Sequence, residues 1–202
     1  NIADYELPSG YSIEITGENE IISEALRDLV FMILLAVVFV YLIMVAQFQS
    51  LMSPFIVMFT LPLAFTGGLL LLWAADLELS VIAMLGFLLL AGIVVNNGIV
   101  LISYINQLRE EGMDKGEALV TASVTRLRPI LLTALTTILA MSSMALGYGE
   151  GAELVQPMAV VTIGGLTYAT LLTLFIVPVL YDILNRKPMR IIEYDKTHEA
   201  TL

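Results

Sequence analysis

Apolar residues fill five long stretches of this chain, and short polar segments separate them. A helix of about 20 mainly apolar residues is long enough to cross the hydrocarbon core of a membrane. The pattern therefore predicts an all-α membrane protein with five transmembrane helices. Their approximate bounds are 29–48, 54–75, 80–105, 129–148 and 156–184.

Proline and glycine predict features within these spans. Pro129 is expected to open the fourth span, because a proline in the first helical turn costs no hydrogen bond. Residues 118–125, just before it, predict a short amphipathic helix of their own. Pro62 is expected to kink the second span, and Gly67–Gly68 permits close packing of another helix.

Lysine and arginine are distributed unevenly along the chain. Of nine such residues, four lie between the third and fourth spans and four follow the fifth. The loops at 76–78 and 147–153 carry acids and no base. Because cytoplasmic loops are enriched in lysine and arginine, we expect loop 106–128 and the C-terminus in the cytoplasm. The N-terminal segment and the two acidic loops are then extracytoplasmic.

The two ends of the chain lie outside the predicted membrane bundle at 29–187. The stretch YSIEIT at 11–16 alternates apolar and polar residues, which predicts a half-buried strand. A single strand is not stable alone, so we expect it to pair with a sheet outside this sequence. A polar run at 18–28 leads into the first helix, and residues 188–202 form a tail.

Composition excludes several classes of function. Charged residues make up 14% of the chain, against about 25% in soluble domains. There is no cysteine, hence no disulfide or thiolate metal site, and no basic stripe for nucleic acid. No predicted span has an ionisable residue in its interior, so the chain alone has no proton carrier. We expect neither an enzyme nor a cofactor.

Two adjacent amides are the most unusual polar groups in the spans. Asn96 and Asn97 lie in the middle of the third span, between Gly92 and Gly98. An amide without a partner in hydrocarbon costs roughly 2–7 kcal/mol. The pair therefore predicts a packed polar contact, which is either structural or functional.

Hydroxyl groups and methionines occur on the fourth span. Thr133, Thr136 and Thr137 share one helix face. Each threonine either bonds to another helix or donates to the carbonyl four residues earlier. Met141 and Met144 have the spacing for a soft-metal site, although filling of the core is the expected role of methionine.

Several of these motifs together resemble the resistance-nodulation-division (RND) superfamily, most closely its hydrophobe/amphiphile efflux branch. The resemblance covers residues 7–187. The matching motifs are LPSG at 7–10, QSLMSP at 49–54, LPL at 61–63, GIVVNNGIVLI at 92–102, RLRPILLT at 126–133 and Pro178 before a basic end.

This resemblance implies a proton-driven exporter of drugs or other amphiphilic compounds, assembled as a homotrimer in the inner membrane. Such transporters contain two repeats of six spans, and the chain matches spans eight to twelve. Residues 1–28 would be the end of the porter domain, and Asn1 in place of Met agrees with a fragment. The implied partners are the N-terminal half of the same transporter, a periplasmic adaptor and an outer-membrane channel.

The resemblance also assigns roles to polar residues. The family's proton-binding acids lie on the fourth span of the first repeat and face the last three spans. Proton coupling is thereby implied for Asn96, Arg126 and Thr133, and we place the adjacent Asn97 in the same group. For Thr136 and Thr137 we expect contacts between helices, from the helix face that they share with Thr133. Family drug/proton antiporters commonly carry lysine where Asn96 stands, and an amide tunes nearby acids less strongly.

Three alternatives remain open from the sequence. The chain could be an inactive scaffold or truncated fragment, a lipid exporter, or a heavy-metal exporter of the same superfamily. Metal export would be favoured by methionine pairs along the path, and the sequence offers only Met141 and Met144.

Overall fold

The computed structural model describes residues 18–147 and 151–185, and within these ranges it contains helices and no strand. This confirms the all-α fold, whereas the strand predicted at 11–16 lies outside the described residues. The helices are α1 (Glu18–Phe48), α2 (Met52–Met58), α3 (Thr60–Ala74), α4 (Val81–Glu110), α5 (Lys115–Ala145) and α6 (Ala152–Leu184).

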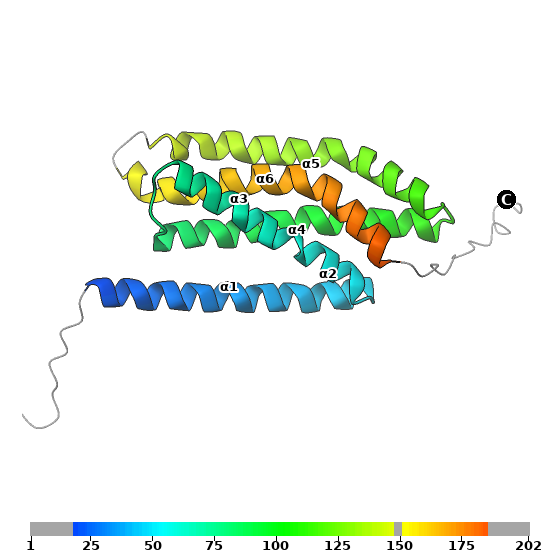
Figure 1. The fold of residues 1–202 in the computed structure, drawn as a ribbon, viewed down its shortest axis with the longest axis horizontal. Helices are drawn as coiled ribbons and strands as arrows, with labels where there is room; N and C mark the ends of the chain where they lie inside the picture. The colour runs from blue at the N-terminus through cyan, green and yellow to red at the C-terminus, as the bar shows by residue number, and fades with distance from the viewer. Residues whose placement is uncertain (1–17, 148–150, 186–202) are drawn as a thin grey trace, which may run out of the picture.

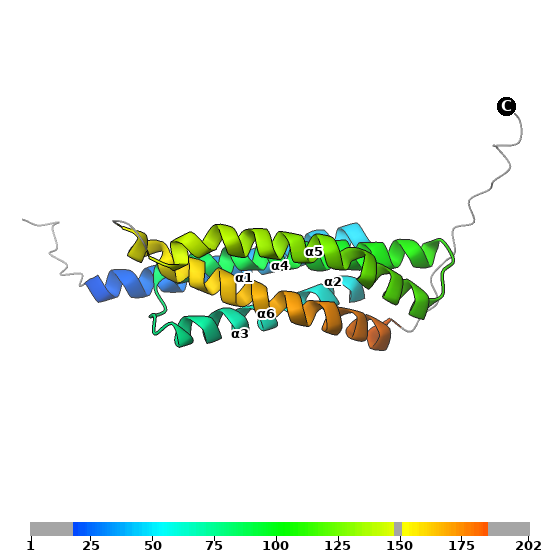
Figure 2. The ribbon, with the colours of Figure 1, turned by 90° about the horizontal axis from the view of Figure 1, so that it is seen from above.

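These helices provide five apolar segments long enough to cross a membrane, of which α2 and α3 together form one. Consecutive segments run in opposite directions along the long axis of the bundle (Figures 1 and 2). The turn between α4 and α5 lies at one end, and the turn between α3 and α4 lies at the other. The acidic turn at 76–78 thus lies at the opposite end of the bundle from the turn at 111–114.

The kink predicted in the second span is confirmed, one turn before Pro62. Proline has no N–H to donate to the carbonyl four residues earlier, which belongs to Met58. The helix is interrupted at that point, because α2 ends at Met58 and α3 begins at Thr60. The intervening Phe59 donates from its N–H to the Phe55 carbonyl oxygen at 3.1 Å.

The prediction that Pro129 opens a new helix is wrong. A single helix, α5, runs from Lys115 to Ala145 with Pro129 in its interior. The apolar face of its first turns, formed by Ala118, Leu119 and Ala122, is buried in the core. This packing supports a helix that continues through the proline, although one backbone hydrogen bond is lost.

Helix α6 is the centre of the bundle and packs against α3, α4 and α5. Its most extensive contact is with α3, where Gly67 faces Gly164. A methyl group on Gly164 would lie 2.7 Å from the Gly67 carbonyl oxygen, and one on Gly67 would lie 2.8 Å from that of Gly164. The glycine pair in the second span thus permits the close packing predicted for it.

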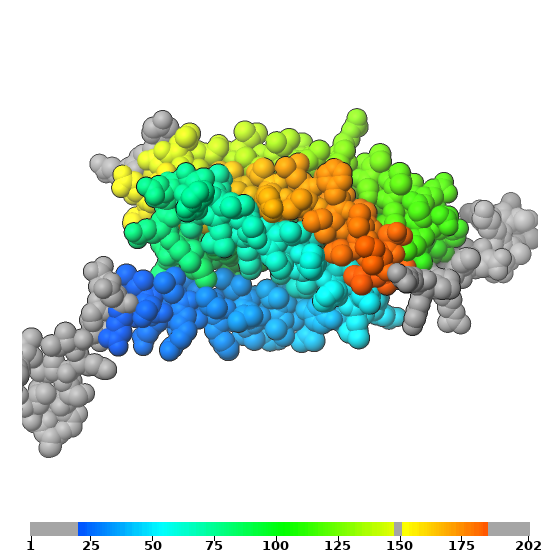
Figure 3. Space-filling model, in the orientation of Figure 1, coloured from blue at the N-terminus to red at the C-terminus, as the bar shows by residue number. Residues whose placement is uncertain are grey.

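Two helices of the bundle are largely uncovered by the described residues. In the most apolar 18-residue stretch of α1 and of α5, only 11% of the residues are buried. In the same stretch of α4 and of α6, 50% are buried. Helix α1 lies along one edge, beside α2 and α4 (Figures 1 and 3). The outer faces of α1 and α5 are therefore free to meet lipid or another part of a larger protein.

Candidate functional site

Three contacts fix the register of the parallel helices α4 and α6. Asn106 accepts a hydrogen bond from the Tyr181 hydroxyl, and the two residues are 75 positions apart. The pairs Gly86 with Val161 and Leu90 with Gly165 have the same separation and are also in contact. A residue on α4 is therefore level with the residue 75 positions later on α6.

The register of the antiparallel helices α4 and α5 follows from Tyr104 and Arg126. The Arg126 guanidinium carbon lies 4.8 Å from the centre of the Tyr104 ring. Asn97 is seven residues before Tyr104, and Thr133 is seven residues after Arg126. Seven residues make about two helical turns, or about 10 Å. Asn97 and Thr133 are therefore level with each other, on the same helix faces as Tyr104 and Arg126.

Polar residues of three helices thus occur at one depth in an otherwise apolar bundle. We call them the polar layer: Asn96 and Asn97 of α4, Thr133 of α5, and Thr170 and Thr173 of α6. The two threonines of α6 belong to the layer because the α4–α6 register places Thr170 level with Val95 and Thr173 level with Gly98. The layer therefore brings together two of the predicted motifs and adds a third helix to them.

The two asparagines of the layer have different surroundings. Asn96 is exposed and lines a cavity of about 330 Å³ between α1 and α4, whereas Asn97 is half-buried. Neither side-chain amide has a hydrogen-bond partner among residues 18–147 and 151–185. The packed polar contact predicted for this pair is therefore not supplied by the described residues.

The threonines of α5 donate within their own helix. The hydroxyls of Thr133, Thr136 and Thr137 donate to the carbonyl oxygens four residues earlier, at 2.9, 2.7 and 2.9 Å. Of the two arrangements open from the sequence, this is the local one. Thr133 and Thr136 are exposed, so their hydroxyl oxygens can still accept a hydrogen bond from outside the bundle.

Arg126 has a charged group that is only partly satisfied. Its guanidinium stacks on Tyr104, while its Nε is buried and has no hydrogen-bond partner in the described part of the chain. Arginine keeps its charge in proteins, and a buried donor without an acceptor is costly. Arg126 as a whole is only half-buried, so the rest of its guanidinium is open to an acceptor, of which a carboxylate is the strongest.

Sequence reasoning missed two groups of polar residues. One is the pair Thr170 and Thr173, whose hydroxyls are buried without a partner in the part of α6 that the structure describes. The other is Arg109, one of the four basic residues between the third and fourth predicted spans, which is buried against Tyr181. The only sequence signal for the threonines was their spacing of three residues, which places them on one face.

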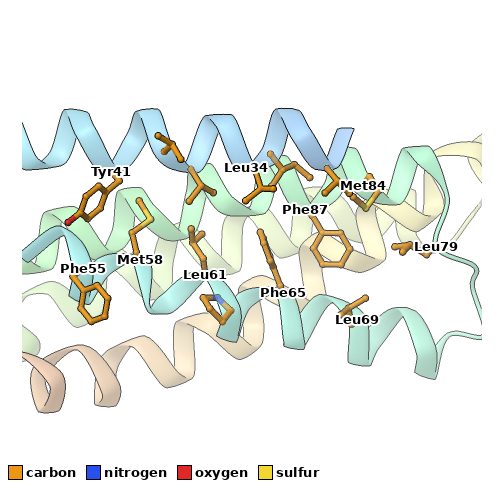
Figure 4. Close-up of a pocket in the computed structure, with 15 residues that line it drawn as sticks. Leu34, Tyr41, Phe55, Met58, Leu61, Phe65, Leu69, Leu79, Met84 and Phe87 are labelled. Carbon is orange, nitrogen blue, oxygen red and sulfur yellow. The ribbon is translucent and has the colours of Figure 1, made fainter. Parts of the chain in front are cut away.

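An apolar groove lies between α1, the α2–α3 segment and the start of α4. Its volume is about 810 Å³, and side chains such as Leu34, Phe65 and Phe87 point into it (Figure 4). The groove adjoins the cavity that Asn96 lines, because Ile33, Val37 and Met58 border both. Within the described ranges, no cluster of three or more His, Cys, Asp or Glu residues could hold a metal ion.

Comparison with curated proteins identifies relatives of similar sequence. The chain is 38% identical over 182 residues to the cobalt-zinc-cadmium resistance protein CzcA of Cupriavidus metallidurans, covering 90% of the chain and 17% of that protein. It is 41% identical over 180 residues to the swarming motility protein SwrC of Bacillus subtilis (89% and 17%). It is 36% identical over 192 residues to the multidrug resistance protein MdtC of Erwinia tasmaniensis (93% and 19%).

Solved structures give a similar result. A crystal structure of a heavy-metal efflux pump matches with a TM-score of 0.76 and 30% identity, covering 85% of this chain and 17% of the pump. The chain thus spans about a fifth or less of the proteins that it resembles. The model of the AcrB/AcrD/AcrF family matches residues 1–185, and the chain therefore belongs to this family of RND efflux transporters.

Proposed function

We propose that this chain is the C-terminal membrane part of a proton-driven efflux transporter, and that its polar layer receives the proton-binding acids of the N-terminal half. One observation carries the proposal: the half-buried Arg126 guanidinium, whose Nε has no hydrogen-bond partner among the described residues, lies about two turns from the layer. A positive group without an acceptor in a membrane bundle calls for an anion on the protein part that packs there.

The open face of α5 supports the same proposal. This helix is as uncovered as α1, yet it exposes Thr133 and Thr136 as well as leucines. Its apolar window also has the lowest mean hydropathy of the five membrane segments, 1.4. A mixed face of this kind suits a protein neighbour better than lipid tails, because helix contacts in membranes are enriched in small and hydroxyl residues.

The charges define how coupling would work. Acids on the N-terminal half, when ionised, would be attracted by Arg126 and would accept hydrogen bonds from the Asn96 amide. Protonation removes the charge and so weakens the attraction to Arg126 more than the bonds to the amide. The attraction would therefore be stronger with ionised acids than with protonated acids. This change would act on α4 and α5, the helices that carry Asn96 and Arg126.

For the cargo we propose amphiphilic compounds, including drugs. The groove beside α1 supports this choice, because its apolar lining suits the hydrocarbon part of an amphiphile. A heavy-metal ion is the second candidate cargo, favoured by the similarity to CzcA and to the heavy-metal efflux pump. Met141 and Met144 would be the soft ligands closest to the layer on α5.

The proposal extends to assembly and orientation. We propose a homotrimer in the inner membrane that works with a periplasmic adaptor and an outer-membrane channel. Segment 106–128 and the C-terminus would lie in the cytoplasm, because eight of the nine lysines and arginines fall within this segment or after the fifth predicted span.

The test uses Arg126→Ala and Asn96→Ala in the complete transporter, reconstituted in liposomes with a pH gradient. Both variants should assemble and lose most of their export of a cationic amphiphilic dye. Arg128→Ala is the matched control, because Arg128 is exposed on the same helix. Export equal to that of the unmodified transporter in both variants, at matched expression, would contradict the proposal.

Two further measurements separate the alternatives. Liposomes that contain this chain alone should carry no proton current, because the acids lie on the other half. Export of Zn²⁺ with no export of the dye by the complete transporter would replace the amphiphile with the metal as cargo. Failure to export either would favour an inactive scaffold.

A further inference from the structure

Two of the four threonines of α6, Thr170 and Thr173, lack the hydrogen bond that the hydroxyls of the other two make. Thr162 and Thr167 donate to the carbonyl oxygens of Met158 and Ile163, four residues earlier, at 2.8 and 2.7 Å. The side-chain oxygens of Thr170 and Thr173 are buried and have no partner within the ranges that the structure describes. These two residues are 6% and 2% exposed, so bulk solvent does not satisfy them.

The helix could satisfy both hydroxyls by itself. Threonine in a helix divides between two side-chain rotamers, and one of them bonds to the carbonyl three or four residues earlier. For Thr170 the acceptor four residues earlier is on Leu166, and for Thr173 it is on Ala169. In the structure neither hydroxyl makes this bond to its own helix.

The polar groups level with these hydroxyls lie on the neighbouring helices. The α4–α6 register places Asn97 between the levels of Thr170 and Thr173. The α5–α6 contact places Thr133 within about one turn of the level obtained through α4, because Gln156 of α6 donates to the Ala145 carbonyl oxygen of α5 at 2.9 Å. Counted from that bond, Thr133 and Thr170 differ in depth by two residues, or about 3 Å.

Asn97 is the member of the layer that best matches the two threonines. Its amide also has no partner among the described residues, and an amide both donates and accepts hydrogen bonds. It points about 100° away from Asn96 around α4. One asparagine can therefore face the N-terminal half while the other faces the interior.

We propose that Thr170 and Thr173 are positioning residues for proton coupling, whose hydroxyls alternate between a bond to the α6 backbone and a bond to the Asn97 amide. This inference rests on the proposed function. It makes α6 the helix that responds when the acids beyond Asn96 gain or lose a proton. A change of rotamer at two adjacent turns supplies the two-state element that such coupling needs.

The test replaces both threonines by valine, which keeps the shape of the side chain and removes the hydroxyl. We would measure export by the complete transporter in liposomes as a function of pH, together with its thermal unfolding. We expect the double variant to be at least as stable as the unmodified protein, because a buried group without a partner has been removed. Export should fall about fivefold or more, with an altered pH profile, and Thr170→Ser with Thr173→Ser should restore it.

Thr162→Val is the matched control. Thr162 is buried on the same helix, but its hydroxyl is bonded to Met158 and it lies at least two turns from the layer. Unchanged export and pH profile in the double valine variant would overturn the inference, as would an equal loss in Thr162→Val. A double variant that is less stable than Thr162→Val would also overturn it, because the hydroxyls would then have only a structural role.

Arg126→Ala, measured in parallel, separates this inference from the proposed function. If Arg126→Ala loses export and the valine variant does not, the inference fails and the proposed function stands. If neither variant loses export, both fail.

Discussion

The Arg109 guanidinium on α4 donates from Nη1 to the Tyr181 hydroxyl on α6 at 3.0 Å, and its central carbon lies 5.7 Å from the centre of that ring. The same hydroxyl donates to Oδ1 of Asn106. Arg109 is 7% exposed and Tyr181 is fully buried. These bonds connect α4 and α6 at one end of the bundle and help to set the register on which the polar layer depends.

Tyr181→Phe should destabilise the protein by roughly 1–3 kcal/mol, because Asn106 then loses a buried donor and Arg109 loses an acceptor. The ring itself stays and keeps its packing in the core. Thermal unfolding in detergent, followed by circular dichroism, measures the difference. Tyr168→Phe is the control, because Tyr168 is on the same helix and its hydroxyl makes no hydrogen bond to a described residue. Equal melting temperatures for the two variants would show that the Tyr181 bonds add no stability.

Asp182→Asn should have a much smaller effect. Oδ1 of Asp182 forms an ion pair with Nζ of Lys115 at 2.7 Å, but the Asp182 side chain is 63% exposed. Exposed ion pairs typically contribute 0.2 to about 1 kcal/mol and are screened by salt. We expect a small loss of stability in 50 mM salt and almost none in 1 M salt. A large loss that persists at high salt would mean that the pair is buried in the intact protein.

The sequence predicts most of the fold because membrane helices are defined by length and hydropathy. The interruption near Pro62 can be predicted from the sequence, because the missing N–H of proline weakens its own helix whatever the other segments do. Pro129 was read wrongly, because continuity of α5 depends on the packing of Ala118 and Leu119 against residues of other helices. Such tertiary contacts override local signals and are not visible in a one-dimensional pattern.

The candidate site was predicted in part for a related reason. Asn96 and Asn97 stand out, because amides are rare inside an apolar run. Thr170 and Thr173 do not, because threonine in a membrane helix usually bonds to its own backbone. Their missing partners and their depth relative to Asn97 become apparent only from the register of α6 against α4.

Gly164→Val should destabilise the bundle by about 1–3 kcal/mol or more through overpacking. A first side-chain carbon at this position would lie 2.7 Å from the Gly67 carbonyl oxygen, so α3 and α6 would have to separate. Gly116→Ala is the control, because a methyl group there lies 3.4 Å from the nearest atom, the Asp114 carboxylate. Unfolding by heat or by denaturing detergent should rank the two variants clearly. If Gly164→Val were as stable as Gly116→Ala, the α3–α6 contact would be looser than described.

Tyr104→Leu should reduce export, whereas Tyr104→Phe should preserve it. The Tyr104 ring lies under the Arg126 guanidinium at 4.8 Å, and a cation over an aromatic face gains roughly 0.5–2 kcal/mol. Phenylalanine keeps most of this attraction, while leucine removes it and leaves Arg126 free to take other rotamers. A loss of about 1 kcal/mol in positioning corresponds to about a fivefold lower rate. Dye export by the complete transporter in liposomes measures the effect, and equal rates for the two variants would show that the stack does not position Arg126.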